Sequence, residues 1–111
     1  MSTRYVLPLA LLASASPPAA GERVRCSFDH GPARACVMTD SVDRGVHRMN
    51  FTAGRDRTTF IGRSNSGWWS GRLNGRAAMG YERNRGNIVF STADLRTSFS
   101  WWYPANEHGT Y

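Results

Sequence analysis

Three histidines are the residues of this sequence most suited to metal binding or acid–base catalysis. They are His30, His47 and His108, which lie far apart and lack the close spacing of zinc ligands, such as His-x-x-x-His. His47 alternates with Met49 and Phe51, a pattern typical of side chains that share one face of a strand. We therefore expect His47 to be partly buried with a hydrogen-bond partner. The sequence predicts no metal site and no cofactor.

Hydrolytic chemistry would need an activated nucleophile or a pair of carboxylates. The sequence contains no Gly-x-Ser-x-Gly motif, and both cysteines are expected in a disulfide, which removes the thiol nucleophile. Glu82 and Asp94 are candidates for a glycosidase-like carboxylate pair, but their spacing does not distinguish them from surface acids. We predict no catalytic residues, and a small hydrolase is the least favoured of three functions.

Aromatic residues in the C-terminal half give the best functional lead. They are Trp68, Trp69, Tyr81, Trp101, Trp102 and Tyr103. A core of this size accommodates about half of these rings, so others would be exposed beside arginines such as Arg72. Trp, Tyr and Arg are the typical anchors of binding surfaces. We predict a binding face formed by Trp68, Arg72, Tyr81 and one of Trp101 and Trp102; the alternative, rings packed under loops or on arginine planes, remains open.

The central element that positions this face is a β-hairpin around Asn74-Gly75. Asn-Gly between two strands favours a type I′ turn, which needs positive φ at both central residues. A two-residue loop pairs Trp68 with Tyr81, and Trp69 with Gly80, whose bare backbone a large ring can cover. Adjacent strand residues point to opposite faces. Each Trp-Trp pair should therefore place one indole on each side of the sheet.

The rest of the chain also indicates strands. No stretch of a dozen residues after the first twenty shows a helical period, and short strands recur every 8–12 residues or so between Gly and Asn turns. We expect strands over 22–29, 34–39, 46–52, 57–64, 68–73, 76–83, 87–91 and 98–103, a loop over 40–45 and one helical turn over 92–97. The predicted fold is all-β: a small antiparallel meander of about seven or eight short strands, closed or partly closed as a barrel.

The first twenty residues have the pattern of a secretory signal. Arg4 precedes a short apolar run, and Ala13-Ser14-Ala15 resembles a cleavage site. The run is much shorter than the roughly 20 residues that span a bilayer, so no transmembrane segment is expected in the mature chain. We expect a signal helix in the precursor only, with retention as an uncleaved anchor as the alternative. The predicted organisation is residues 1–20 as signal and linker, 21–103 as one β domain, and 104–111 as a loose tail.

Two cysteines, Cys26 and Cys36, flank a turn-forming Asp29-His30-Gly31-Pro32 sequence. Export favours their oxidation, because disulfides persist in oxidising compartments. The bridge would join two antiparallel strands and stabilise the domain by about 3 kcal/mol in the chain-entropy model.

The net charge is +6, and all 14 basic residues are arginines. Such a surface attracts anions: phosphorylated lipid heads, acidic glycans or acidic proteins. Nucleic acid is a further ligand of small basic β domains and is less favoured here. The leading hypothesis is a noncatalytic periplasmic or secreted binding module for an anionic envelope glycan or an acidic envelope protein. The alternative is a structural or interaction subunit of an envelope assembly.

Overall fold

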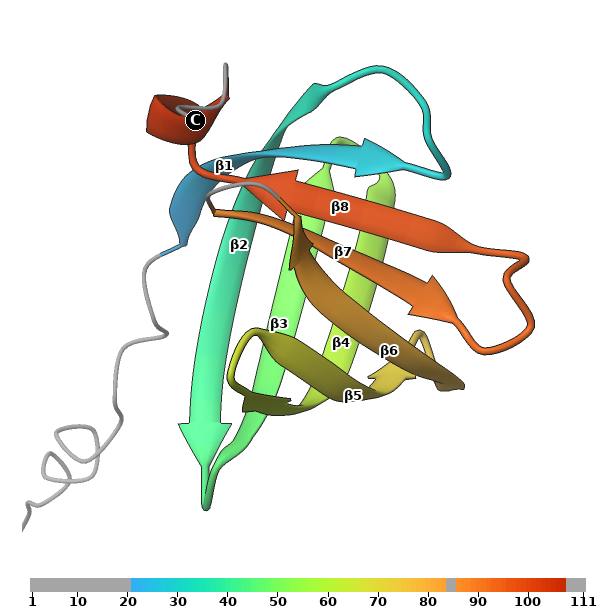
Figure 1. The fold of residues 1–111 in the computed structure, drawn as a ribbon. Coiled ribbons are helices and arrows are strands. Elements are labelled where there is room, and N and C mark those ends of the chain that lie inside the picture. Colours follow the sequence, from blue (N-terminus) through green and yellow to red (C-terminus); the bar gives the residue numbers. More distant parts are fainter. Residues whose placement is uncertain (1–20, 84–85, 108–111) are drawn as a thin grey trace, which may run out of the picture.

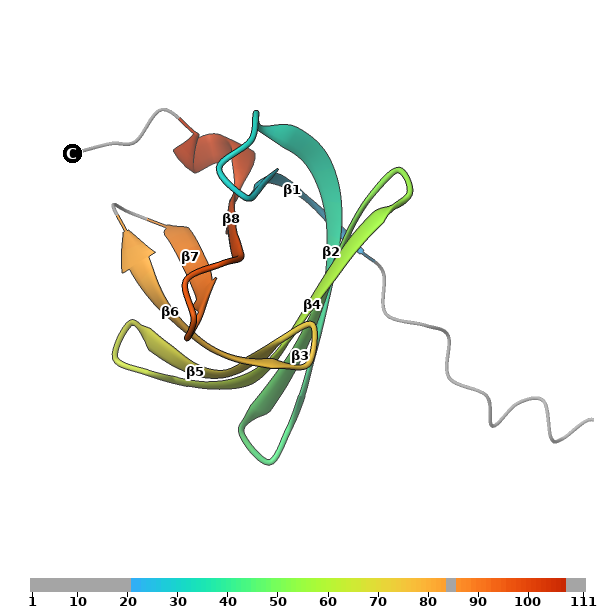
Figure 2. The same ribbon diagram turned by 90° about the vertical axis from the view of Figure 1, so that its right-hand side faces the viewer.

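The computed structural model describes residues 21–83 and 86–107. Eight strands follow one another in chain order as an antiparallel meander, and β1 pairs with β8 to close a barrel (Figures 1 and 2). The elements are β1 Glu22–Phe28, β2 Arg34–Asp43, β3 Val46–Ala53, β4 Asp56–Asn65, β5 Trp68–Leu73, β6 Arg76–Arg83, β7 Asn87–Thr92, β8 Ser98–Trp102 and the 3-10 helix η1 Pro104–Asn106. The predicted all-β fold is confirmed, and closure leaves no free sheet edge in the described part of the chain.

The β5–β6 hairpin has the predicted bounds and register. Asn74 and Gly75 have φ of +51° and +83°, as a type I′ turn requires. Trp68 stands opposite Tyr81 and Trp69 opposite Gly80. The turn is also tied to β4, because Thr59 N donates to Asn74 Oδ1 at 2.9 Å and Asn74 N donates to Thr59 O at 2.8 Å.

The barrel interior is filled by phenylalanines. Phe51, Phe60, Phe90 and Phe99 are fully buried, and each contributes about 1.5–3 kcal/mol by burial. Phe60 and Phe90 stack with ring centroids 4.0 Å apart. The Phe90 ring also lies on Gly80, where an added Cβ would come within 2.5 Å of Phe90 Cδ1. The ring that covers this glycine is therefore that of Phe90 on β7, on the side opposite β5, and not that of Trp69, as the register had predicted.

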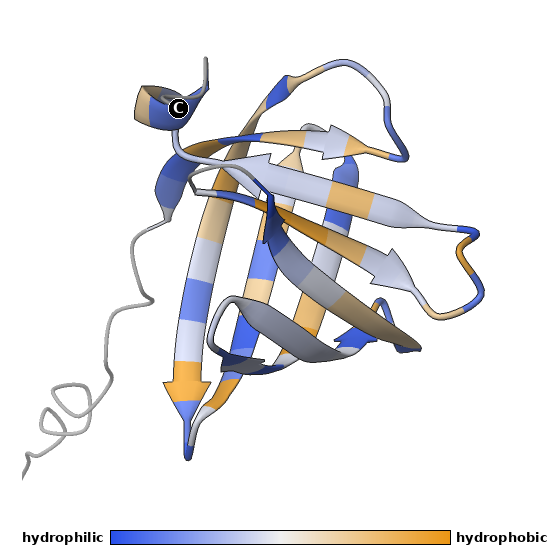
Figure 3. Ribbon diagram, in the orientation of Figure 1, coloured by the Kyte–Doolittle hydropathy of each residue, from blue (hydrophilic) through white to orange (hydrophobic). Residues whose placement is uncertain are grey.

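The alternation of apolar and polar residues along the strands produces this core. Apolar and polar bands alternate along several strands in Figure 3, and the inward set includes Val24, Cys26 and Phe28 on β1. The predicted disulfide is present: Cys26 and Cys36 are both buried and join β1 to β2 inside the barrel, with Cα atoms 6.0 Å apart.

Two local predictions are wrong. Strand β2 continues to Asp43 instead of ending at residue 39, because it forms a ladder with β3 as far as the Asp43–Val46 pair. Residues 92–97 do not form a helical turn: Leu95 has φ of +62°, and the Thr92 hydroxyl donates to Asp94 and accepts from Thr97 N. These side-chain bonds compete with helix formation.

The first residues of the predicted tail have local structure. Pro104–Asn106 forms η1, and Arg25 Nε lies 3.0 Å from Glu107 Oε1, a close ion pair without hydrogen-bond alignment. The predicted signal segment, 1–20, and the last residues of the tail, 108–111, lie outside the described residues. None of the helical segments in the described ranges is long and apolar enough to cross a membrane.

Candidate functional site

Trp68 and Trp69 project to opposite sides of the barrel wall, as predicted. The Trp68 side of the wall faces outward, and this residue is 60% exposed. Trp69 points inward and packs edge-on against Phe60 and Phe90, with both centroid distances at 5.9 Å. One indole therefore supports the fold, and its neighbour is free to contact another molecule.

The second tryptophan pair does not contribute an exposed ring. Trp101 is 4% exposed and its ring lies 5.5 Å from that of Phe51 in the core. Trp102 belongs to the outer side by alternation, yet it is only 8% exposed. It stands opposite Arg25 on β1, where η1 and Glu107 return over the barrel. The expectation that one of these indoles joins Trp68 on an open face was wrong.

The outer side of β5 and β6 instead presents an apolar cluster. Trp68, Met79 and Tyr81 are 60%, 55% and 39% exposed, and the rings of Trp68 and Tyr81 lie 6.0 Å apart. Together with Leu95 from the β7–β8 turn, these side chains line a hollow of about 400 Å³. We call Trp68, Met79, Tyr81 and Leu95 the apolar hollow. Sequence reasoning identified Trp68 and Tyr81 and missed the other two.

Arginines flank the apolar hollow on the β4 side. Arg72, which was predicted, lies on the same side of β5 as Trp68, four residues and roughly 13 Å away along the strand. Arg63 on β4 is closer, because its cross-strand partner Ser70 is the next outward residue after Trp68. Both arginines are exposed. Arg72 donates to the Gly75 carbonyl at 3.2 Å, and Arg63 donates to the Arg44 carbonyl at 3.1 Å. Neither forms an ion pair with an acid of the described ranges.

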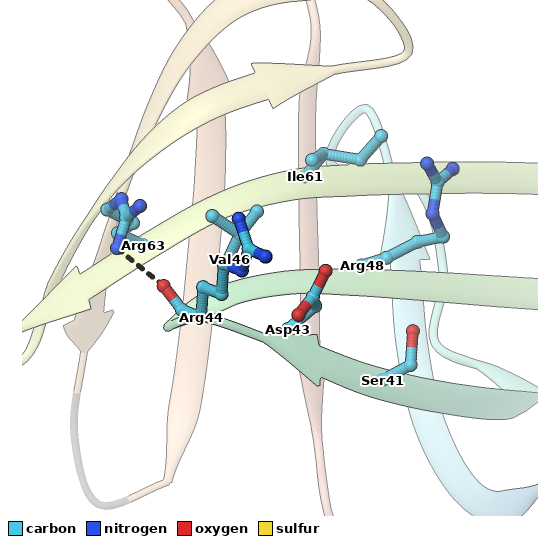
Figure 4. Close-up of a pocket in the computed structure, with 7 residues that line it drawn as sticks. All are labelled: Ser41, Asp43, Arg44, Val46, Arg48, Ile61 and Arg63. Atoms are coloured by element: carbon cyan, nitrogen blue, oxygen red, sulfur yellow. Dashed lines mark hydrogen bonds between the residues drawn. The ribbon is translucent and has the colours of Figure 1, made fainter.

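Arg63 also belongs to a basic hollow of about 400 Å³ over β2–β4 (Figure 4). We call its polar lining the arginine hollow; this lining consists of Ser41, Asp43, Arg44, Arg48 and Arg63. A third hollow of about 650 Å³ contains Arg63, Trp68 and Met79, and so connects the other two. The outer wall therefore carries a continuous path from guanidinium groups to exposed aromatic rings.

The residues considered for catalysis have structural partners. His47 is partly buried and has a hydrogen-bond partner, as predicted, with Nδ1 3.0 Å from Asp40 Oδ2. Its ring also forms a T-shaped pair with Trp69. Glu82 accepts a hydrogen bond from Gly86 N. Asp94 accepts one from the Thr92 hydroxyl, and this bond is the main reason that the pKa of Asp94 is lowered. A hydrogen bond from Arg96 N and the positive charge of Arg76 lower it further. No cluster of three potential metal ligands occurs in the described residues.

Tyr103 is a second residue whose surroundings shift its pKa. Its hydroxyl donates to Glu22 Oε1 at 3.3 Å. Burial raises the pKa of Tyr103, and the negative charge of Glu22 raises it further. This contact lies at β1 and β8, away from Trp68, and ties the end of the last strand to the first.

A comparison with known protein families, curated proteins and solved structures found no significant match. The functional argument therefore depends on the chemistry of the outer wall.

Proposed function

We propose that this protein is a noncatalytic binding module of the bacterial envelope or of the secreted fraction, and that its outer wall binds an anionic glycan. The observation that carries the proposal is the exposed indole of Trp68 beside Arg63 in one connected hollow. An acidic protein would use the same arginines and is the second candidate for the ligand.

The two kinds of side chain match the two parts of such a ligand. An indole offers a large, rigid apolar face on which a sugar ring can lie. A guanidinium group binds carboxylate or phosphate in a fixed, two-pronged geometry. Because Arg63 belongs to both the arginine hollow and the hollow at Trp68, an extended oligosaccharide can contact the ring and the cations together.

Trp68 contributes enough surface for its removal to be measurable. A Trp side chain offers up to about 250 Å², so the 60% that is exposed amounts to roughly 150 Å². Covering half of that area is worth about 2 kcal/mol, or roughly thirtyfold in affinity. We expect Trp68→Ala to weaken glycan binding by about this factor.

Titration calorimetry with a panel of neutral and acidic envelope oligosaccharides tests the proposal. Trp68→Ala should weaken binding of the best ligand, and Arg63→Gln should weaken it and reduce its salt dependence. Val37→Ser is the matched control, since Val37 is an exposed apolar residue on β2, 47% exposed and outside the three connected hollows. If wild type and Trp68→Ala bind every glycan equally, the outer wall is not a glycan site.

A further inference from the structure

The apolar hollow contains one residue that neither local conformation nor packing explains. Leu95 is 82% exposed and has φ of +62°. Positive φ is unfavourable for a leucine and is tolerated best by Gly, Asn and Asp. Gly, Asn or Asp would suit this turn better than Leu, and none of them would expose an isobutyl group.

Leu95 is also not isolated on the surface. It lines the same hollow as Trp68, Met79 and Tyr81, from the β7–β8 turn at the right of Figure 1. Contiguous exposed apolar side chains on a soluble domain indicate a contact with another apolar phase or molecule. Trp and Tyr are the residues that settle at the interface between water and lipid.

The charges next to this cluster favour an anionic partner. Arg63 and Arg72 lie on the neighbouring strands of the same outer wall, and the acid adjacent to Leu95, Asp94, is paired with Arg76 at 3.5 Å. A protruding apolar cluster flanked by cations has the chemistry of a peripheral site on an anionic membrane surface.

We propose that Trp68, Met79 and Leu95 insert into the surface of a bilayer with anionic head groups, while Arg63 and Arg72 contact the lipid phosphates. The proposal rests on the proposed function in one respect, that this wall is a free binding surface. It goes beyond that function in the partner: an anionic bilayer is a further ligand of the same wall, and Leu95 contributes to binding the bilayer although the glycan path from Arg63 to Trp68 does not need it.

Trp68 provides a local fluorescence probe. It is the one indole with a largely exposed ring, since Trp69 points inward and Trp101 and Trp102 are buried. The full chain is titrated with vesicles of phosphatidylglycerol and, separately, of phosphatidylcholine alone. With the anionic vesicles we expect a blue shift of tryptophan emission and quenching by bromine-labelled lipid; both should be absent with phosphatidylcholine. Salt at about 1 M should abolish the long-range attraction, because the screening length falls to about 3 Å.

Leu95→Asn separates binding from folding. Asn suits positive φ better than Leu does, so we expect this variant to be at least as stable as the wild type. Its vesicle affinity should be about tenfold lower, because an apolar side chain that enters the bilayer is lost. Arg63→Gln and Arg72→Gln should each reduce vesicle affinity about fivefold. Val37→Asn is the control, because Val37 is an exposed apolar residue on the β1–β2 side, and this variant should have the vesicle affinity of the wild type. All variants keep residues 1–20, so any contribution of that segment is common to them.

Unchanged emission with phosphatidylglycerol vesicles, or equal vesicle affinity of Leu95→Asn and wild type, would overturn the membrane proposal. If soluble acidic glycans still bind and Trp68→Ala weakens their binding, the proposed glycan function survives that result. If neither glycans nor vesicles bind, both proposals fail. If vesicles bind, Leu95→Asn weakens that binding, and no glycan binds, the membrane proposal is supported and the glycan proposal is contradicted.

Discussion

Replacing each of two adjacent tryptophans by alanine should give opposite results for stability and binding. Trp69 lies inside the barrel, with its ring against Phe60 and Phe90 at 5.9 Å and against His47 at 5.0 Å. Large-to-small substitution of a core Trp costs about 3–5 kcal/mol, and because Trp69 is half-buried we expect about 2–4 kcal/mol. Trp68 has one aromatic neighbour, Tyr81, and a cross-strand pair of this kind contributes about 0.2–1 kcal/mol.

Urea unfolding followed by far-ultraviolet circular dichroism measures this difference, since tryptophan fluorescence would change with the variants themselves. With a slope of about 1 kcal/mol per molar urea for so small a domain, Trp69→Ala should lower the midpoint by about 2–4 M. Trp68→Ala should lower it by about 1 M or less. Trp69→Phe, which keeps a ring, should recover more than half of the loss. Equal midpoints for the two alanine variants would refute the assignment of the two indoles to opposite sides of the wall.

Three further outcomes follow from contacts in the barrel. Gly80→Ala should destabilise by about 1–3 kcal/mol, because its Cβ would meet the buried Phe90 ring at 2.5 Å; in a double-mutant cycle Phe90→Leu should relieve part of that cost. Converting both Cys26 and Cys36 to alanine should cost about 2–5 kcal/mol in thermal or urea unfolding. The pKa of Tyr103 is higher in the folded than in the unfolded protein. The contribution of Tyr103 to stability is therefore complete below about pH 10 and is lost as pH rises through the folded-state pKa. Ultraviolet titration of the folded protein should show a late ionisation step that Tyr103→Phe abolishes.

The fold could be predicted from the sequence because its signals are local. Asn74-Gly75 fixes the β5–β6 register through the dihedral angles that only a few residues adopt. The alternation of Met49 and Phe51 with polar residues then decides which side of β3 is buried. What local signals could not show is where the strands end. The end of β2 depends on pairing with β3 as far as the Asp43–Val46 pair, which no single segment encodes.

The candidate site was only partly predictable for the same reason. Alternation correctly separates Trp68 from Trp69, but it does not reveal what covers an outward side chain. Trp102 is on the outer side and still buried, in the region where the chain returns after η1 and Glu107 reaches Arg25. Arg63 was missed because its proximity to Trp68 is a cross-strand relation between β4 and β5. Leu95 was missed because the residues around it were assigned to a helical turn.

In this closed barrel, the residues that stabilise the fold and the exposed residues of the outer wall are different sets. Buried phenylalanines from β3, β4, β7 and β8 fill the interior, and neither Trp68 nor Leu95 packs in that core. Exposed apolar groups on an open sheet edge would invite pairing with other chains, but in this barrel β1 and β8 pair with each other. The outer wall can therefore carry exposed rings beside arginines without offering a strand edge for aggregation. Because these side chains contribute little to the interior, changes to them should alter folding little, and on the proposals above such changes should mainly weaken binding.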